Sequence, residues 1–361
     1  MRILEKLENQ DRLNYEDGLE LYELDLFTLG HFANLRRTQM WGKKVYFNIN
    51  RHINPTNICK DVCKFCAFSS NRKNPNAYKY TKDEVLRIAE DAYKRGIKEI
   101  HVVSAHNKEH DLYWYIDIFK TIKAKFPTVH VKAFTAAEVH FLSTLHNLSY
   151  DETIDEMIGA GVDSMPGGGA EIFDEKVRAY ICKGKVSSEN WLKIHEIWHR
   201  KGKLSNATML FGHVEEKKDR IGHMLRLRDV QDRTGGFNAF IPLVYQRENN
   251  YLKVNNFLGS QDILKTIAIS RLMLDNIPHI KAYWATTTLG LAMVAQEFGA
   301  DDLDGTIEKE AIQSAGGAKS ASGQALQDFL DIIITSGFIP VERDSLYNEL
   351  KVYEETICGV C

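Results

Sequence analysis

The sequence lacks long apolar runs, a bias of charge and a secretory leader. No apolar stretch is long enough to cross a bilayer, and the first residues, MRILEKLENQ, are too charged for the apolar core of a secretion signal. The formal net charge of the 361 residues is −3, with Lys and Arg scattered along the chain. The sequence therefore predicts no membrane span and gives no sign of nucleic-acid binding. We expect a cytoplasmic protein, in which thiols stay reduced.

Cysteine is also scarce, but three of the six cysteines lie close together. Cys59, Cys63 and Cys66 form a CxxxCxxC pattern after an apolar run at 45–49. Three thiolates on one loop can bind three irons of a [4Fe–4S] cubane, whereas most such clusters have four cysteine ligands. The fourth iron would keep an open position for a substrate or cofactor. The alternative is a zinc site completed by His52, but structural zinc sites usually pair two Cys-rich knuckles, and the body of the chain has no second one.

The other three cysteines do not extend this site. Cys182 stands alone after a helical stretch, and we expect a buried or half-buried thiol there. Cys358 and Cys361 form a CxxC at the end of a charged segment, where two thiolates cannot complete a second cluster. We interpret this pair as an exposed feature of the tail, with a redox or second-metal role as the alternative.

Strand-like and helix-like segments alternate along most of the chain. Residues 1–44 are charged and leucine-rich with helical spacing, and predict two short helices. Thr81–Glu84 and Ser149–Glu152 are capping boxes that each begin a helix. The apolar runs predicted as strands are 45–50, 99–104, 129–134, 162–165, 206–211, 237–243, 279–284 and 300–303.

Eight strands that alternate with helices predict parallel βαβ units and a TIM-type (β/α)8 barrel at 45–345. The helical extension at 1–44 precedes it, and a C-terminal tail at 346–361 follows. An open doubly wound sheet is the alternative, but no GxGxxG follows any strand. In a barrel the chemistry lies on loops after the carboxyl ends of the strands, which is where the cysteine loop is predicted.

Three consecutive glycines follow the fourth predicted strand: Gly167, Gly168 and Gly169. Three glycines let the backbone approach a ligand closely and exceed what a plain turn needs. Glu171 and Arg178 come shortly after them. In an enzyme that binds S-adenosylmethionine (SAM), a carboxylate can bind the ribose hydroxyls of this molecule, and a guanidinium can bind its methionine carboxylate. The alternative is a tight strand-to-helix turn with a solvated Glu and Arg.

Polar side chains follow most of the other predicted strands. They are His106, Asn107, Glu138, His140, His213, Gln246, Arg247, Tyr283, Thr286, Asp301, Asp302 and Asp304. Their common position at one mouth of a barrel, rather than the identity of any one of them, makes the group a candidate site.

One motif points to a different chemistry. His195-Glu-Ile-Trp-His199 matches the HExxH pattern of zinc proteases on a predicted helix. However, Trp191, Ile194 and Trp198 form the inward stripe of that helix, and His199 falls in its last turn, where a cation suits the helix dipole. We therefore keep an HExxH hydrolase only as an alternative.

Longer stretches of the sequence resemble one known family. Arg51-His-Ile-Asn-Pro-Thr-Asn-Ile-Cys59, Cys63-Lys-Phe-Cys-Ala-Phe68, and the segments 163–171, 207–213 and 225–237 resemble the radical S-adenosylmethionine (SAM) enzymes of the futalosine route to menaquinone. The match extends from residue 46 to near residue 345. Two enzymes of this route share these motifs. The segments 132–138, 280–284 and 301–306 look like the one that adds an adenosyl radical to an enol-ether benzoate, and the alternative is the one that cyclises dehypoxanthine futalosine.

The resemblance implies a [4Fe–4S] cluster on Cys59, Cys63 and Cys66, with SAM consumed as a substrate. The 5′-deoxyadenosyl radical would add to 3-[(1-carboxyvinyl)oxy]benzoate, and rearrangement with loss of CO₂ would follow. An electron donor such as flavodoxin or ferredoxin is implied as a partner, and a homodimer is left open. Ser104-Ala-His-Asn107 stands where many relatives carry a Gly-Gly pair that helps to hold the amino group of SAM.

The resemblance and the predicted barrel mouth together give three sets of expected site residues. Contacts to the cofactor are expected from Phe65, Phe68, Gly167, Gly168, Gly169, Glu171 and Arg178. Contacts to the substrate are expected from Arg51, His106, His213, Arg247 and Tyr283, because two carboxylates call for cationic or hydrogen-bond donors. His52, Glu138 and Asp304 are the candidates for catalysis.

Overall fold

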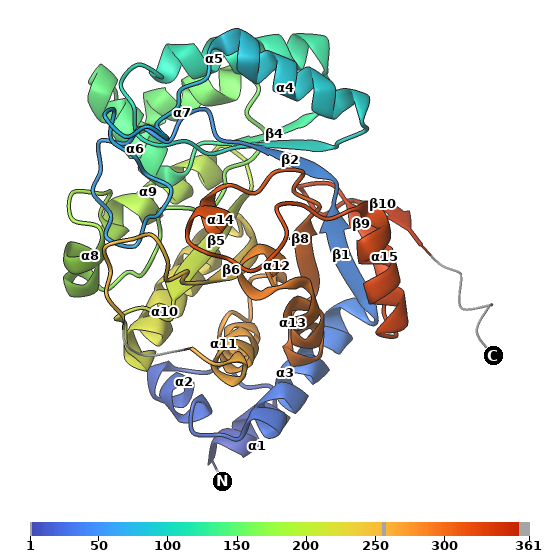
Figure 1. Ribbon diagram of the computed structural model, residues 1–361. Coiled ribbons are helices and arrows are strands. Elements are labelled where there is room, and N and C mark those ends of the chain that lie inside the picture. Colours follow the sequence, from blue (N-terminus) through green and yellow to red (C-terminus); the bar gives the residue numbers. More distant parts are fainter. Residues whose placement is uncertain (1, 255–257, 354–361) are drawn as a thin grey trace.

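Parallel strands are arranged as a barrel in the computed structural model, which describes residues 2–254 and 258–353 (Figure 1). The strands are β1 (Lys44–Asn48), β2 (Asn50–Ile53), β3 (Glu99–Val102), β4 (His130–Ala133), β5 (Ser205–Phe211), β6 (Phe237–Val244), β7 (His279–Ile280) and β8 (Asp302–Gly305). Pairing runs in chain order from β2 to β4, through single bridges at Ser164 and Met165 to β5, and on to β8 and β1. The predicted TIM-type barrel is confirmed.

Four predicted strands differ in detail from the observed ones. The run at 279–284 is reduced to β7 at His279–Ile280, and α12 begins at Trp284. The run at 45–50 is divided at Ile49, because β1 pairs with β8 and β9 (Ile339–Arg343) while β2 pairs with β3. The run at 162–165 is reduced to the two bridges at Ser164 and Met165. The last strand is Asp302–Gly305 rather than 300–303, so that two of the acidic residues lie within the strand instead of after it.

The chain after the barrel adds two strands to the sheet beside β1. β9 continues the sheet beside β1, and β10 (Glu349–Val352) pairs with it in the region predicted as a tail. Arg343 reaches Asp302 with 2.5 Å between Nε and Oδ2, and the Ser345 hydroxyl donates to Glu99. These polar contacts hold the last strands against the barrel. Cys358 and Cys361, interpreted from the sequence as an exposed pair, lie outside the described residues.

Helices surround the barrel. They are α4 (Lys82–Lys94), α5 (Leu112–Lys125), α6 (Ala136–His146), α7 (Tyr150–Gly159), α8 (Glu175–Ile181), α9 (Ser188–Arg200), α10 (Lys217–Thr234), α11 (Ser260–Met273), α12 (Trp284–Thr287), α13 (Leu289–Val294), the 3₁₀ helix η1 (Ala295–Phe298), α14 (Ile312–Ala315) and α15 (Leu326–Thr335). The capping boxes predicted at Thr81–Glu84 and Ser149–Glu152 are both formed. Among the described residues, none of these helices is long and apolar enough to span a membrane.

Helix α6 was not predicted. Glu138 was predicted to lie on a loop after a strand, but Thr135 caps α6 and Glu138 is the reciprocal partner of this capping box. The signal was present as Thr-x-x-Glu at 135–138, the same pattern that was recognised at the two other helix starts.

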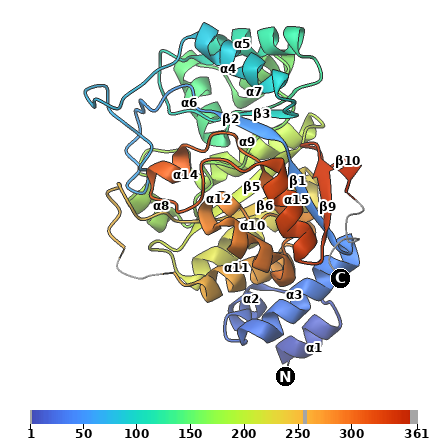
Figure 2. The same cartoon turned by 45° about the vertical axis from the view of Figure 1, so that its right-hand side comes forward.

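Three helices precede the barrel where two were predicted. They are α1 (Arg2–Glu8), α2 (Tyr15–Leu21) and α3 (Leu26–Trp41), and each of the last two begins at a capped residue, Asn14 or Asp25. Figure 2 shows them together at one end of the molecule, with α3 beside α11. The turn after α2 reaches the start of α10, where Lys217 pairs with Glu23 at 3.2 Å.

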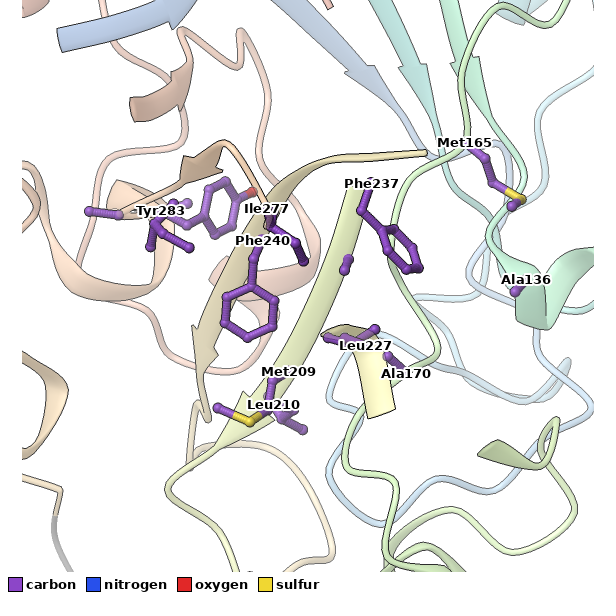
Figure 3. Close-up of a cluster of buried hydrophobic side chains, with 14 of the residues drawn as sticks. Ala136, Met165, Ala170, Met209, Leu210, Leu227, Phe237, Phe240, Ile277 and Tyr283 are labelled. Atoms are coloured by element: carbon purple, nitrogen blue, oxygen red, sulfur yellow. The ribbon is translucent and has the colours of Figure 1, made fainter. Parts of the chain in front are cut away.

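The core fills the space between the sheet and its helices. Figure 3 shows apolar side chains of β5 and β6 with those of neighbouring segments, including Met209, Phe237, Phe240, Leu227 of α10 and Ile277. Every residue of β5 is buried, as is typical of a parallel strand covered on both faces. The rigid barrel leaves the loops at its mouth to form the site.

Candidate active site

A cavity of about 300 Å³ opens where the barrel strands end. Its walls come from the cysteine loop, from residues 103–106 after β3, from the glycine run and from the ends of β5, β6 and β8. Figure 2 shows the cysteine loop, α8 and α14 on the same side of the molecule. This is the mouth at which a TIM barrel carries its chemistry.

The cysteine loop is fixed by backbone hydrogen bonds to its surroundings. The N–H groups of Cys59 and Lys60 donate to the carbonyls of Ser70 and His106, at 3.1 and 3.0 Å. Cys59, Cys63 and Cys66 all line the cavity and are free thiols. The loop is therefore built to present three sulfur atoms to one enclosed space.

Two of the three sulfur atoms accept a backbone hydrogen bond. The N–H of Asp61 donates to Cys59 Sγ at 3.4 Å, and the N–H of Ser69 donates to Cys66 Sγ at 3.3 Å. Burial raises the pKa of Cys63 to about 12, so the free thiol stays protonated in the absence of a metal. A bound metal supplies the positive charge that favours the thiolates.

The donors fit a cluster better than a single ion. Within the described residues, no three His, Cys, Asp or Glu side chains surround one point as the ligands of one metal ion would. His52, the fourth ligand of the zinc alternative, has its Nε2 at 3.1 Å from His101 Nδ1. In a cubane each cysteine binds a different iron, so the sulfurs need to face a common space without converging on one point. Cys59, Cys63 and Cys66 meet this requirement.

The glycine run borders the same cavity, and its glycines are required by close packing. A Cβ on Gly167 would lie 2.8 Å from the backbone of Ala207 on β5, and one on Gly168 would lie 2.8 Å from Thr135 Cγ2. Gly169 has φ of +89°, and its Cβ would meet Ala137 of α6 at 2.8 Å. The run therefore packs against β5 and α6 while its backbone faces the cavity.

Comparisons with known proteins agree with this geometry. A sequence model described as the radical SAM superfamily matches residues 53–227, and one described as the CofH/MqnC C-terminal region matches 234–356. Aminodeoxyfutalosine synthase of Thermus thermophilus is 44% identical over 98% of this chain and 96% of its own. The chain belongs to the radical SAM superfamily.

Two further relatives are similar to this chain over nearly its whole length. Aminodeoxyfutalosine synthase of Streptomyces coelicolor is 39% identical over 97% of this chain and 94% of its own. Cyclic dehypoxanthine futalosine synthase of the same organism is 36% identical over 98% of this chain and 89% of its own. Among solved structures, methylornithine synthase superposes with a TM-score of 0.74 at 15% identity, covering 94% of this chain and 97% of that one, which supports the fold alone.

Several expected residues lie in this radical SAM cavity. They are His52, Phe65, Phe68, His106, Glu171, Tyr283 and Asp304, beside the three cysteines and three glycines. His106 Nδ1 lies 2.7 Å from Asp61 Oδ2, and its ring stacks on Phe141. Burial alone would raise the pKa of Asp61, but the hydrogen bond from His106 outweighs it and the pKa is lowered.

A buried ionic network forms the floor of the cavity. Asp304 accepts from Lys281 Nζ at 2.5 Å, and Lys132 reaches Glu99 at 2.7 Å. Burial would raise the pKa of Asp304, but Lys281 and Lys132 outweigh burial and lower it, so this carboxylate is ionised. Burial lowers the pKa of His52, which is therefore neutral at physiological pH. Lys132 lines the cavity, although the sequence analysis did not select it.

Lys185 was also missed, and no motif marks it. Its Nζ donates to Glu171 Oε1 at 2.7 Å, and it lies over the ring of Phe65 with 5.6 Å to the centroid. Burial alone would lower the pKa of Lys185, but Glu171 and Cys63 raise it well above its usual range. Lys185 is thus a permanent cation between the cysteine loop and the glycine run.

Two expected site residues hold the loops of the mouth in place instead of facing the cavity. The Arg178 guanidinium donates to the carbonyls of Gly169, Ala170, Ile172 and Val186. Glu138 accepts hydrogen bonds from the Thr135 and Ser104 N–H groups, at 2.8 and 2.9 Å. The expected cofactor contact of Arg178 and the catalytic role of Glu138 do not match these positions, because their polar groups already bind the backbone.

Three expected substrate contacts do not line the cavity. Arg51 pairs with Glu308 at 3.8 Å. His213 is buried, and its two ring nitrogens bind the Leu210 carbonyl and the Val214 N–H. Arg247 is exposed and donates to the Val254 carbonyl at 3.2 Å. Position after a strand was too coarse a criterion to tell which way each side chain points.

The HExxH motif lies away from the mouth and is structural. His195 and His199 both contact the Ser205 hydroxyl, at 2.8 and 2.7 Å, at the start of β5. Glu196 pairs with Arg233 and Arg200 instead of facing the two histidines. No single-ion site exists here within the described residues, so the motif does not support the hydrolase alternative.

Proposed function

We propose that this chain is an aminodeoxyfutalosine synthase of menaquinone biosynthesis. It would join SAM to 3-[(1-carboxyvinyl)oxy]benzoate and release methionine, CO₂ and 6-amino-6-deoxyfutalosine. The observation that carries the proposal is one cavity that combines three cluster-type cysteines, a glycine run and a polar floor, in a chain 44% identical to such a synthase along nearly its whole length. SAM is then a consumed substrate.

Cys59, Cys63 and Cys66 would hold the [4Fe–4S] cluster. When bound, the cluster supplies the electron that breaks the C5′–S bond of SAM and releases the 5′-deoxyadenosyl radical. The residues of this chain provide the enclosure for that radical, because a primary carbon radical reacts with almost any C–H bond. The apolar rings of Phe65 and Phe68 at the mouth, and the packed barrel below, exclude water and hold the alkene close to C5′.

SAM would lie between the cysteine loop and the glycine run. The backbone of Gly167–Gly169 borders the cavity without side chains, which leaves room for an adenosyl group. Glu171 faces the same space and can accept hydrogen bonds from ribose hydroxyls with the oxygen that Lys185 leaves available. Arg178 supports this contact indirectly by holding the carbonyls of the loop.

The benzoate substrate needs donors for two carboxylates, and the cavity offers them at its floor. Lys132 and the neutral His52 line the cavity, whereas Arg51 and Arg247 do not. We propose Lys132, His52, His106 and Tyr283 as the donors. Asp304, ionised beside Lys281, orients this lysine and the neighbouring groups and does not serve as a proton donor.

The test is product identification after anaerobic reconstitution with iron and sulfide. With SAM, dithionite and the enol-ether benzoate, the protein should form 6-amino-6-deoxyfutalosine and CO₂, measured by mass spectrometry. Cys63→Ala should abolish product without unfolding the barrel. A protein that instead releases 5′-deoxyadenosine with dehypoxanthine futalosine would be the cyclase, in line with its 36% identity to a cyclic dehypoxanthine futalosine synthase.

A further inference from the structure

Three segments meet on the outer side of the cysteine loop. They are residues 60–64, 180–184 and 251–254. The Lys64 N–H donates to the Ile181 carbonyl at 2.8 Å, and the Tyr251 N–H donates to the Lys64 carbonyl at 2.7 Å. We call the exposed surface of these three segments the cysteine-loop face. It is a rigid surface, because the segments share backbone hydrogen bonds.

The cysteine-loop face is locally cationic on a chain of net charge −3. Its four cationic residues are Lys60, Lys64, Lys183 and Lys253, and its only acidic residue is Asp61. Asp61 lines the cavity and lies against His106, and it also pairs with Lys60 at 3.7 Å. Lys64, Lys183 and Lys253 have no acidic partner within the three segments. The face therefore attracts a partner of negative charge.

The same face exposes large apolar side chains. Val62 is 74% exposed, Tyr251 78% and Tyr180 50%, and Lys64 Nζ lies 3.6 Å from the centre of the Tyr180 ring. Single exposed apolar residues are common on any protein, but here three occur on segments joined by hydrogen bonds. Tyrosines surrounded by charged residues are typical of protein interfaces.

The cysteine-loop face lies directly beside Cys63, one of the three proposed cluster cysteines. Cys63 lies between Val62 and Lys64 in the chain, and its thiol faces the cavity on the inner side of the loop. The inference rests on the proposed function, in which each cleavage of SAM needs one electron. Since the rate of electron transfer falls steeply with distance and substrates fill the inner side, the outer side of the loop is the place for a reductant to bind.

We propose that the cysteine-loop face is the docking site of a small acidic electron-transfer protein that carries a reduced flavin or iron–sulfur cluster at its surface. The carrier is oxidised by one electron, and that electron reduces SAM, whose C5′–S bond breaks to methionine and the 5′-deoxyadenosyl radical. SAM and the benzoate together contain the same electrons as methionine, CO₂ and 6-amino-6-deoxyfutalosine, so the electron is given back when CO₂ leaves and the ketone forms. The carrier therefore supplies the electron that starts turnover and replaces any electron that is lost. Electron-transfer contacts are small and transient, which suits a face built from three short segments.

The test compares two reductants on charge-reversal variants. Lys183→Glu/Lys253→Glu reverses two exposed lysines of the face, and Lys98→Glu/Lys125→Glu makes the same change at the start of β3 and the end of α5. With reduced flavodoxin or a [2Fe–2S] ferredoxin at low ionic strength, the first pair should lower turnover roughly tenfold and the control pair should not. With dithionite, both pairs should match the wild type.

Binding of the oxidised carriers, measured by calorimetry, gives a second readout. Val62→Ser/Tyr251→Ser should weaken binding, and salt should weaken it in the wild type but much less in Lys183→Glu/Lys253→Glu. Equal carrier-driven rates in both charge-reversal pairs overturn the docking site, and so does a wild type that uses dithionite but binds neither carrier. Absence of the adenosyl product with dithionite would instead overturn the proposed function.

Discussion

Individual charged residues at the mouth of this barrel divide into those that face the cavity and those that hold the backbone around it. Asp304 and Lys132 line the cavity, where Asp304 pairs with Lys281 and Lys132 with Glu99. Arg178 and Glu138 instead bind main-chain groups. Burying an ionised group is costly unless it is paired or hydrogen-bonded, and each of these groups has such a partner. The role of each residue therefore follows from its partner rather than from its position after a strand.

Glu138 should be needed for the fold and not for the chemistry. Glu138→Ala removes a buried capping box and leaves the Ser104 N–H without its acceptor, so the free energy of unfolding should fall by about 2 kcal/mol. Glu138→Gln keeps an oxygen that can accept these bonds and should retain both stability and turnover. Denaturant titration and product formation measure the two quantities. A stable Glu138→Gln protein without turnover would return Glu138 to catalysis.

Lys185 should tune the cluster that we propose for Cys63 and its two neighbouring cysteines. Lys185→Met removes a cation beside a site that becomes more negative on reduction, so the reduction potential should fall by tens of millivolts, since ~1.4 kcal/mol corresponds to about 59 mV for one electron. Lys185→Arg should restore most of the potential, and Lys183→Met on the exposed surface should leave it unchanged. Redox titration followed by electron paramagnetic resonance distinguishes these outcomes. Equal reduction potentials in all variants would show that Lys185 does not influence the cluster.

The three candidate cluster cysteines could be selected from the sequence, and most of their neighbours in the cavity could not. Spacing alone pointed to Cys59, Cys63 and Cys66, because all three come from one loop and line one cavity. Lys132 and Lys185 reach the cavity from distant segments, and nothing local to either lysine distinguishes it from an exposed one. Such contacts depend on how the loops pack, which a single sequence does not reveal.

At the scale of elements, the glycine run joins the fold to the site. It replaces a full fourth strand, touches β5 and α6 without side chains, and is held by Arg178 from α8. The prediction of a ligand loop here was based on three glycines in a row, and the packing shows a second reason for them. Helix α6 must begin directly after β4 for this packing, and that helix was among those not predicted.

Two matched substitutions can show whether glycine is needed at position 169 for close packing or only for its positive φ. Gly169 and Gly184 both have positive φ, +89° and +87°, but only the Cβ of Gly169 would meet another atom within 4 Å. Gly169→Ala should therefore lower the free energy of unfolding by about 2 kcal/mol more than Gly184→Ala, and it should weaken SAM binding as well. Thermal unfolding and SAM titration of the reconstituted proteins provide the test. Equal effects would mean that the run is only a turn.

At the scale of the whole molecule, the barrel buries an unusual amount of histidine. Burial lowers the pKa of His110 and His130 to about 4 and that of His199 and His223 to about 3. Strand periodicity predicted the barrel well, because it depends on apolar runs that are contiguous in the sequence. It could not predict that β9 pairs with β1, because that contact joins two segments almost 300 residues apart in the sequence.

Neutral buried histidines make the fold sensitive to acid. A histidine in the unfolded chain has a pKa near 6.5. Below that pH the unfolded state binds protons that the folded state does not bind, so the free energy of unfolding falls as the pH falls from about 6.5 toward 3. His199 alone should account for about 2 kcal/mol between pH 7 and pH 5. In His199→Gln, the loss of unfolding free energy between pH 7 and pH 5 should therefore be smaller by about 2 kcal/mol. The variant should also be less stable at pH 7, because the contacts to Ser205 and Thr234 are altered. Exposed His31→Gln is the matched control and should leave the slope unchanged. Denaturant titrations of the metal-free proteins at a series of pH values measure the slopes, and parallel curves for wild type and His199→Gln would show that His199 already titrates in the folded state.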